Sequence, residues 1–145
     1  MESLRIKKET YKIEVNDNGD YIEFNLRDIN LPDKILNSAE KINKERQNLE
    51  IKIKACEKQY GNNPKLLTKK IGEIQREYFK NMRYYFDGFL GENACYKIFG
   101  KDNFYGMFEE LMEQLEKHFD KMELQIEEIK KDLVEKYSPK SKEVI

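Results

Sequence analysis

Residues 84–100 read YYFDGFLGENACYKIFG and decide how the chain folds, because they combine three glycines with several aromatic residues in a strongly charged chain. Gly91 and Gly100 suit helix ends, since glycine readily adopts the left-handed conformation in which the last carbonyls of a helix find donors. Between these glycines, the segment 92–99 has a small apolar face and predicts a short helix. The stretch therefore predicts a corner between two long helices, with its phenylalanines in the core.

The segments on both sides of this corner have the apolar spacing of amphipathic helices, which we predict over residues 64–87 and 103–137. The apolar positions of the later segment are Phe108, Met112, Leu115, Phe119, Met122, Ile126, Ile129 and Leu133. They alternate in steps of four and three, the period of a coiled-coil seam. Asp102 or Asn103 can cap the start of this helix, and residues 138–145 are expected to form a frayed tail.

A further long helix is predicted upstream, over residues 32–60. Pro32 is tolerated in a first helical turn, and the sequence GNNP at 61–64 is a strong helix stop. Apolar residues recur along this segment at helical spacing, so its seam can pack against those of the other two helices.

Residues 11–26, YKIEVNDNGDYIEFNL, predict a β-hairpin, because two alternating segments flank Asn18-Gly19. A two-residue type I′ loop at Asn-Gly sets the register. The expected pairs are Asp17–Asp20, Val15–Ile22, Ile13–Phe24 and Tyr11–Leu26. All six apolar residues then share one face, and a lone hairpin is barely stable in water. We therefore expect this face to cover other parts of a fold.

Together these elements predict a mainly α protein. An N-terminal β-hairpin is followed by a bundle of long antiparallel helices, with one short helix at the corner before the last. A length of 145 residues suits one domain, which we expect to span residues 1–137.

The composition argues against some classes of partner. Charged residues make up 38% of the chain, but the net charge is −1, whereas nucleic-acid-binding proteins carry a clear basic excess. No apolar run approaches the length of a membrane span, and no N-terminal segment resembles a signal peptide. We therefore expect neither nucleic acid nor membrane as a partner. From Glu109 to Glu135, ten acids against four lysines give a local balance of −6, most simply a solvated helix face.

The residues that usually carry chemistry are few and isolated. His118 is the single histidine, and its neighbours three and four positions away are poor metal ligands. Cys56 and Cys95 lie in no motif, which predicts packed, reduced thiols. The glycines of the corner lack the spacing of a phosphate-binding loop. We expect no metal, no cofactor and no enzymatic activity.

The tyrosines of the corner leave two alternatives open. Core packing explains most of the aromatic residues, but Tyr84, Tyr85 and Tyr96 suit a half-wet contact surface, where tyrosine is favoured. With Phe89 and Phe99, they are the predicted partner-binding residues.

The same corner carries a resemblance to a known family. FDGFLGENACYKIFG (86–100), followed by NFYGMFEELMEQLEKHF (103–119), resembles the phage tail assembly chaperone-like proteins of tailed phages of Gram-positive bacteria, which are encoded near the tape-measure protein. The matching positions are Phe86, Phe89, Leu90, Gly91, Glu92, Cys95, Lys97, Ile98, Phe99 and Gly100. Asn93 departs from the family pattern, which has a second glycine there.

The resemblance implies a non-enzymatic protein that works in the bacterial host cytoplasm. Its partner would be the tape-measure protein, kept soluble during tail morphogenesis. Two alternatives stay open. The chain is a structural or self-associating helical virion or adaptor protein, a homo-oligomer paired through the seam from Phe108 to Leu133, or it is a phage antagonist or trigger of host defence.

Overall fold

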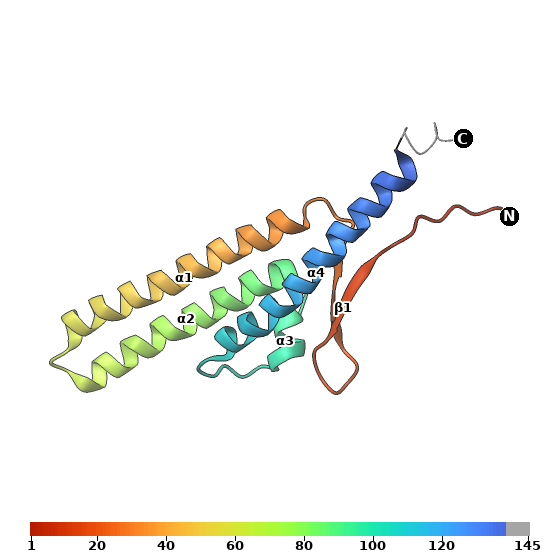
Figure 1. Cartoon of the computed structure of the whole chain (residues 1–145). Coiled ribbons are helices and arrows are strands. Elements are labelled where there is room, and N and C mark those ends of the chain that lie inside the picture. The colour runs from red at the N-terminus through yellow and green to blue at the C-terminus, as the bar shows by residue number, and fades with distance from the viewer. Residues whose placement is uncertain (139–145) are drawn as a thin grey trace.

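A computed structural model describes residues 1–138 of the protein, and the predicted tail at 139–145 lies outside the described residues. Figure 1 shows a β-hairpin followed by long helices, with a short helix before the last one. The elements are β1 (Thr10–Glu14), β2 (Tyr21–Asn25), α1 (Leu31–Tyr60), α2 (Pro64–Leu90), α3 (Ala94–Phe99) and α4 (Met107–Tyr137). The predicted fold class is confirmed.

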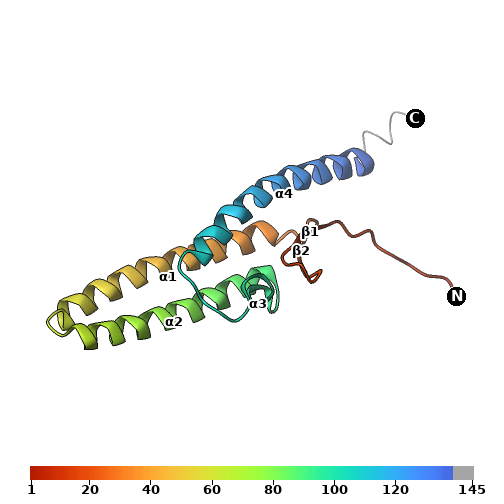
Figure 2. The ribbon, with the colours of Figure 1, turned by 90° about the horizontal axis from the view of Figure 1, so that it is seen from below.

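Helices α1 and α2 form an antiparallel pair, and α4 crosses this pair near the end where the hairpin lies (Figures 1 and 2). The largest fully buried side chains come from all three long helices and α3: Phe86, Ile42, Met82, Met107, Met122 and Cys95. All the buried residues of α2 lie in its second half, from Tyr78 onward. The core therefore sits at one end of the α1–α2 pair.

The predicted helical seams supply much of this core. Phe108, Leu115 and Met122 of α4 and Ile42 of α1 are buried in this core, whereas Cys56 of α1 is buried outside it. Apolar periodicity at 3.6 residues per turn was a sufficient signal here, because these side chains face a neighbouring helix at every second turn.

Gly91 terminates the second helix as predicted, but the predicted bound near residue 87 is three residues short, because α2 continues to Leu90. Phe86 and Leu90 thereby extend the buried ladder of this helix, and Phe86 stacks on Phe108 at a centroid distance of 5.4 Å. Gly91 ends the helix at φ +118°, with its N–H donating to the Asp87 carbonyl at 3.1 Å. Gly88 does not interrupt the helix because its neighbours keep burying apolar surface.

The predicted starts of the last two helices are also wrong. The short helix begins at Ala94, two residues late, because Asn93 is left-handed at φ +61°. The last helix begins at Met107 rather than residue 103, and neither Asp102 nor Asn103 caps it; Gly106 precedes it at φ +84°. Asn103 instead accepts a hydrogen bond from Arg83.

The hairpin is confirmed, but its predicted register is wrong by two positions. Tyr11 pairs with Phe24 and Ile13 with Ile22, which leaves a four-residue loop at 16–19. The Asn16 side-chain oxygen accepts hydrogen bonds from the backbone N–H groups of Asn18 and Asp20, at 2.9 and 3.3 Å. This side chain organises the loop, and Asn18 does not adopt the positive φ of a type I′ turn.

A shift of two positions keeps every side chain on its predicted face, because strand faces alternate with a period of two. Ile22, Phe24 and Leu26 are buried, and Tyr11, Ile13 and Val15 pack against the same core. The apolar face of the hairpin therefore covers the helices of its own chain.

Candidate functional site

Three of the five predicted contact residues line one hollow of about 480 Å³ between the start of α1 and the end of α2. Tyr84, Tyr85 and Phe89 come from α2. The facing wall on α1 is formed by Lys34, Asn37, Ser38 and Lys41. Asp87 and Gly88 of α2 complete the lining, and we call this hollow the aromatic groove.

The two tyrosines of the aromatic groove differ in exposure, because Tyr85 is partly buried and packs against the core. Tyr84 is 75% exposed, and its ring meets that of Tyr85 edge-on at 6.0 Å. Neither hydroxyl makes a hydrogen bond within residues 1–138. Tyrosine combines a large apolar ring with a polar tip, which suits a surface that is covered on binding.

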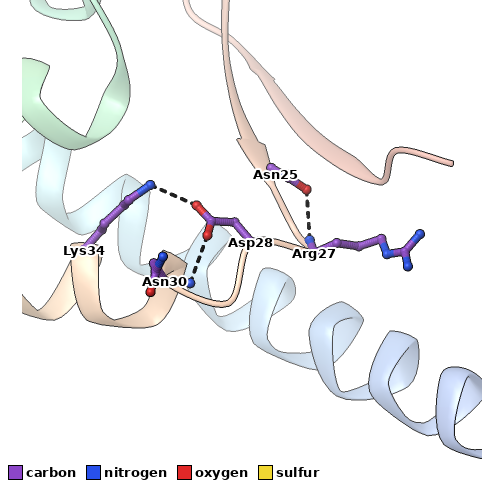
Figure 3. Close-up of polar contacts among 5 residues, drawn as sticks. All are labelled: Asn25, Arg27, Asp28, Asn30 and Lys34. Carbon is purple, nitrogen blue, oxygen red and sulfur yellow. Dashed lines mark hydrogen bonds and ion pairs between the residues drawn. The ribbon is translucent and has the colours of Figure 1, made fainter. Parts of the chain in front are cut away.

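The α1 wall of the groove is positively charged. Lys41 makes no ion pair within the described part of the chain. Lys34 donates to Asp28 at 2.9 Å, and Asp28 also accepts from the Asn30 backbone N–H at 2.9 Å (Figure 3). The hydrogen bond from Lys34, then that from Asn30, lowers the pKa of Asp28. Lys34 is thus held in place by Asp28, while Lys41 is free to pair with an acidic residue of a partner.

Gly88 leaves the groove open on the α2 side. A glycine inside a helix costs about 1 kcal/mol relative to alanine, yet a Cβ added at Gly88 would meet no atom within 4 Å. Packing within the chain therefore does not require this glycine. The space beside Gly88 is open, so this position adds no side chain to the α2 wall of the groove.

The other two predicted contact residues lie outside the aromatic groove. Tyr96 is exposed on α3. Phe99 is half-buried and meets the ring of Phe108 edge-on at 5.8 Å. Phe99 is therefore part of the margin of the core, and the structure does not bring these two residues together with the groove tyrosines.

Sequence reasoning missed Arg83, which ties α2 to the segment that leads into α4. Its guanidinium donates to the Asn103 side chain at 2.8 Å, and to the carbonyls of Gly100 and Asp102 at 3.0 and 2.8 Å. The same group lies over the ring of Phe99. One arginine among many charged residues gives no sequence signal of this role, which depends on where the linker crosses α2.

The histidine has a structural setting. The hydroxyl of Tyr11 and Nδ1 of His118 share a hydrogen bond of 2.7 Å, which joins β1 to α4. Burial, then the charge of Lys121, lowers the pKa of His118. No cluster of three metal-ligating side chains was found within residues 1–138.

Both cysteines are buried and free, as the sequence predicted. Burial, followed by the nearby Asp87 carboxylate, raises the pKa of Cys95 to about 12. Since the thiolate is the reactive form, this thiol is poorly suited to nucleophilic chemistry.

No helix within residues 1–138 is long and apolar enough to cross a membrane. No curated protein and no solved structure matches the chain. A family model matches residues 18–143, a span that includes β2 and all four helices. The chain therefore belongs to a family of unknown function, DUF6673.

Proposed function

We propose that this protein is a non-enzymatic, phage tail assembly chaperone-like protein that binds the tape-measure protein in the cytoplasm of the bacterial host. The observation that carries the proposal is the aromatic groove, with the exposed Tyr84, the partly buried Tyr85, a free lysine and an open side at Gly88. The resemblance of residues 86–100 supplies the identity of the partner.

The chemistry of the groove suits an amphipathic helix. The rings of Tyr84 and Phe89 offer apolar surface, and the missing side chain of Gly88 gives a helical ridge room to settle between α1 and α2. Lys41 is placed to pair with an acidic residue beside the apolar ridge of the partner. A partner helix held in this way has its apolar face covered, which keeps the partner soluble.

The test is co-expression with tape-measure fragments, followed by measurement of the soluble fraction. The protein is expected to solubilise at least one fragment, and Gly88→Leu should weaken its binding roughly tenfold by filling the groove. Leucine has a higher helix propensity than glycine, so α2 should stay helical in the variant. The circular dichroism spectrum should therefore be unchanged. Gly88→Ala is the matched control, because a single methyl group fills little of the groove.

Two results would contradict the proposal. If no fragment is rescued at any stoichiometry, the protein is not a chaperone for the tape-measure protein. If Gly88→Leu binds as tightly as Gly88→Ala, the aromatic groove is not the binding surface.

The self-associating alternative also has an observation in its favour. Ile126, Ile129 and Leu133, in the second half of α4, are only partly buried although they continue the apolar seam. The host-defence alternative stays a prediction of the sequence.

A further inference from the structure

A basic hollow lies beside the first half of α2. Two hollows of about 240 and 530 Å³ adjoin there, because they share four lining residues: Gly72, Gln75, Arg76 and Tyr105. Lys69 also lines this surface, whereas no carboxylate among residues 1–138 does. We call the surface the α2 hollow. It shares no lining residue with the aromatic groove.

The cations of the α2 hollow have no acidic partner. Neither Lys69 nor Arg76 makes an ion pair within the described part of the chain. The guanidinium of Arg76 lies over Gly72, where an added Cβ would stand 3.2 Å from Nη1. Lys65 and Lys80, also without an ion pair, extend the same helical face in steps of four residues. Like charges at this spacing repel each other, so the face lacks negative charge to balance it.

Two exposed aromatic rings border these cations. Phe104 is 48% exposed and Tyr105 is 81% exposed. The hydroxyl of Tyr105 donates to the side-chain oxygen of Gln75 at 3.3 Å, which holds the ring beside α2. Tyrosine and arginine are enriched where one protein covers another. The α2 hollow therefore has the chemistry of a docking surface for an acidic segment of a protein.

The opposite charge occurs on one face of α4. Five acids follow one another in steps of three and four residues: Glu109, Glu113, Glu116, Asp120 and Glu123. Positions at this spacing lie on the same side of a helix. All five side chains are exposed, and none makes an ion pair within residues 1–138. The nearby lysines, Lys117 and Lys121, fall outside the series. We call these five residues the acidic face of α4.

The two charged faces match in length, but they cannot meet within one chain. At 1.5 Å per residue, the helix spans about 22 Å from Lys65 to Lys80 and about 21 Å from Glu109 to Glu123. Helix α4 begins at Met107 and runs toward the hairpin end, away from the first half of α2 (Figures 1 and 2). A second copy of the chain supplies a face of the required charge and length.

We propose that the acidic face of α4 in one copy docks on the α2 hollow of a second copy. Glu113 and Glu116, at the centre of the acidic face, pair with Lys69 and Arg76, and the ring of Tyr105 covers the contact from the side. Each copy carries both surfaces, so two copies can make the contact twice. The proposal is independent of tape-measure binding, because it does not use the aromatic groove.

The first test is the mass in solution, measured by light scattering in low and in high salt. In low salt the mass should rise above 17.5 kDa as concentration increases. In about 1 M sodium chloride, where the screening length is about 3 Å, the mass should return to that of the monomer. A monomer at every concentration in low salt would overturn the proposal. Association that survives high salt would also overturn it, and would indicate pairing through the apolar seam of α4.

The second test reverses the charges of each face. Lys69→Glu with Arg76→Glu, and Glu113→Lys with Glu116→Lys, should each give a monomer, because like charges then meet. An equimolar mixture of the two variants should associate again, since every contact in the mixed pair joins opposite charges. All four positions are exposed, and circular dichroism checks that both variants are folded. A mixture of folded variants that stays monomeric would contradict the proposed contact.

The matched control makes the same change in net charge on the other helix of the pair. Lys44 and Lys58 of α1 are exposed and line neither the α2 hollow nor the aromatic groove. The variant Lys44→Glu with Lys58→Glu should associate like the natural protein. If it loses association as fully as Lys69→Glu with Arg76→Glu, the assignment to the α2 hollow is wrong. Solubilisation of the tape-measure fragment should stay intact in all these variants, which keeps the two proposals distinguishable.

Discussion

Asn93 is the non-glycine residue that adopts positive φ within residues 1–138. At φ +61° and ψ +16° it starts α3 in the left-handed conformation, which asparagine tolerates better than most residues. The tail-chaperone pattern has glycine at this position, and glycine is the residue for which this conformation carries no steric cost. The departure from the pattern is therefore conservative for the backbone.

This conformation makes a clear stability prediction. Asn93→Ala should lower the free energy of unfolding by about 1–2 kcal/mol, because alanine carries the steric cost of a left-handed residue. Asn93→Gly should be neutral or slightly stabilising. Urea denaturation of the three proteins measures both effects. Equal destabilisation by glycine and alanine would show that the side chain of Asn93, rather than its backbone, matters.

At the scale of elements, the contact between β1 and α4 responds to pH. The lowered pKa of His118 means that the folded state favours the neutral ring. In the unfolded chain the histidine binds a proton near the ordinary pKa of 6.5. Above that pH the ring is neutral in both states, so protonation of His118 does not lower the stability of the folded protein. Stability should fall as pH drops below 6.5, toward the lower pKa of the folded state.

The measurement is the pH dependence of unfolding for the natural protein and for His118→Asn, whose side-chain oxygen can accept from the Tyr11 hydroxyl. The difference between the two proteins isolates the histidine from the many carboxylates. As pH falls from 7 to 5, we expect the natural protein to lose more stability than His118→Asn. A difference that does not change with pH would contradict the lowered pKa.

The elements themselves were predictable from the sequence, whereas several of their ends were not. Apolar spacing identified all four helices and the hairpin, because burial imposes its period directly on the sequence. The start of α4 was missed since Asn103, a good cap in isolation, is bound by Arg83. The hairpin loop was missed because Asn16 also reaches the Lys97 carbonyl at 3.0 Å, a contact 81 positions away.

At the scale of the whole molecule, the site was predictable only in part. Tyr84, Tyr85 and Phe89 were identified because aromatic residues beside a glycine stand out in a charged chain. Their α1 wall, with Lys41, was not identified, because no local pattern says which faces of two helices will meet. The hollow between the start of α1 and the second half of α4 has the same origin, since it depends on where α4 leaves the start of α1.

The uneven position of the core predicts uneven stability along α2. Its first half, up to residue 77, contains no buried residue, whereas Tyr78, Met82, Phe86 and Leu90 are buried in its second half. Amides of residues 66–76 should therefore exchange with deuterium faster than those of residues 78–90, since local opening is easier where little apolar surface is buried. Uniform protection along α2, measured by hydrogen exchange, would contradict this prediction.

The contact between Tyr11 and His118 spans 107 positions, so the first strand and the last helix meet only late during synthesis. Until α4 has emerged from the ribosome, the apolar face of the hairpin lacks Phe119, against which Phe24 packs at 6.0 Å. Exposed strand edges and apolar faces invite aggregation in incomplete chains. The order of the elements thus makes translation to the end of α4 the step that protects the nascent protein.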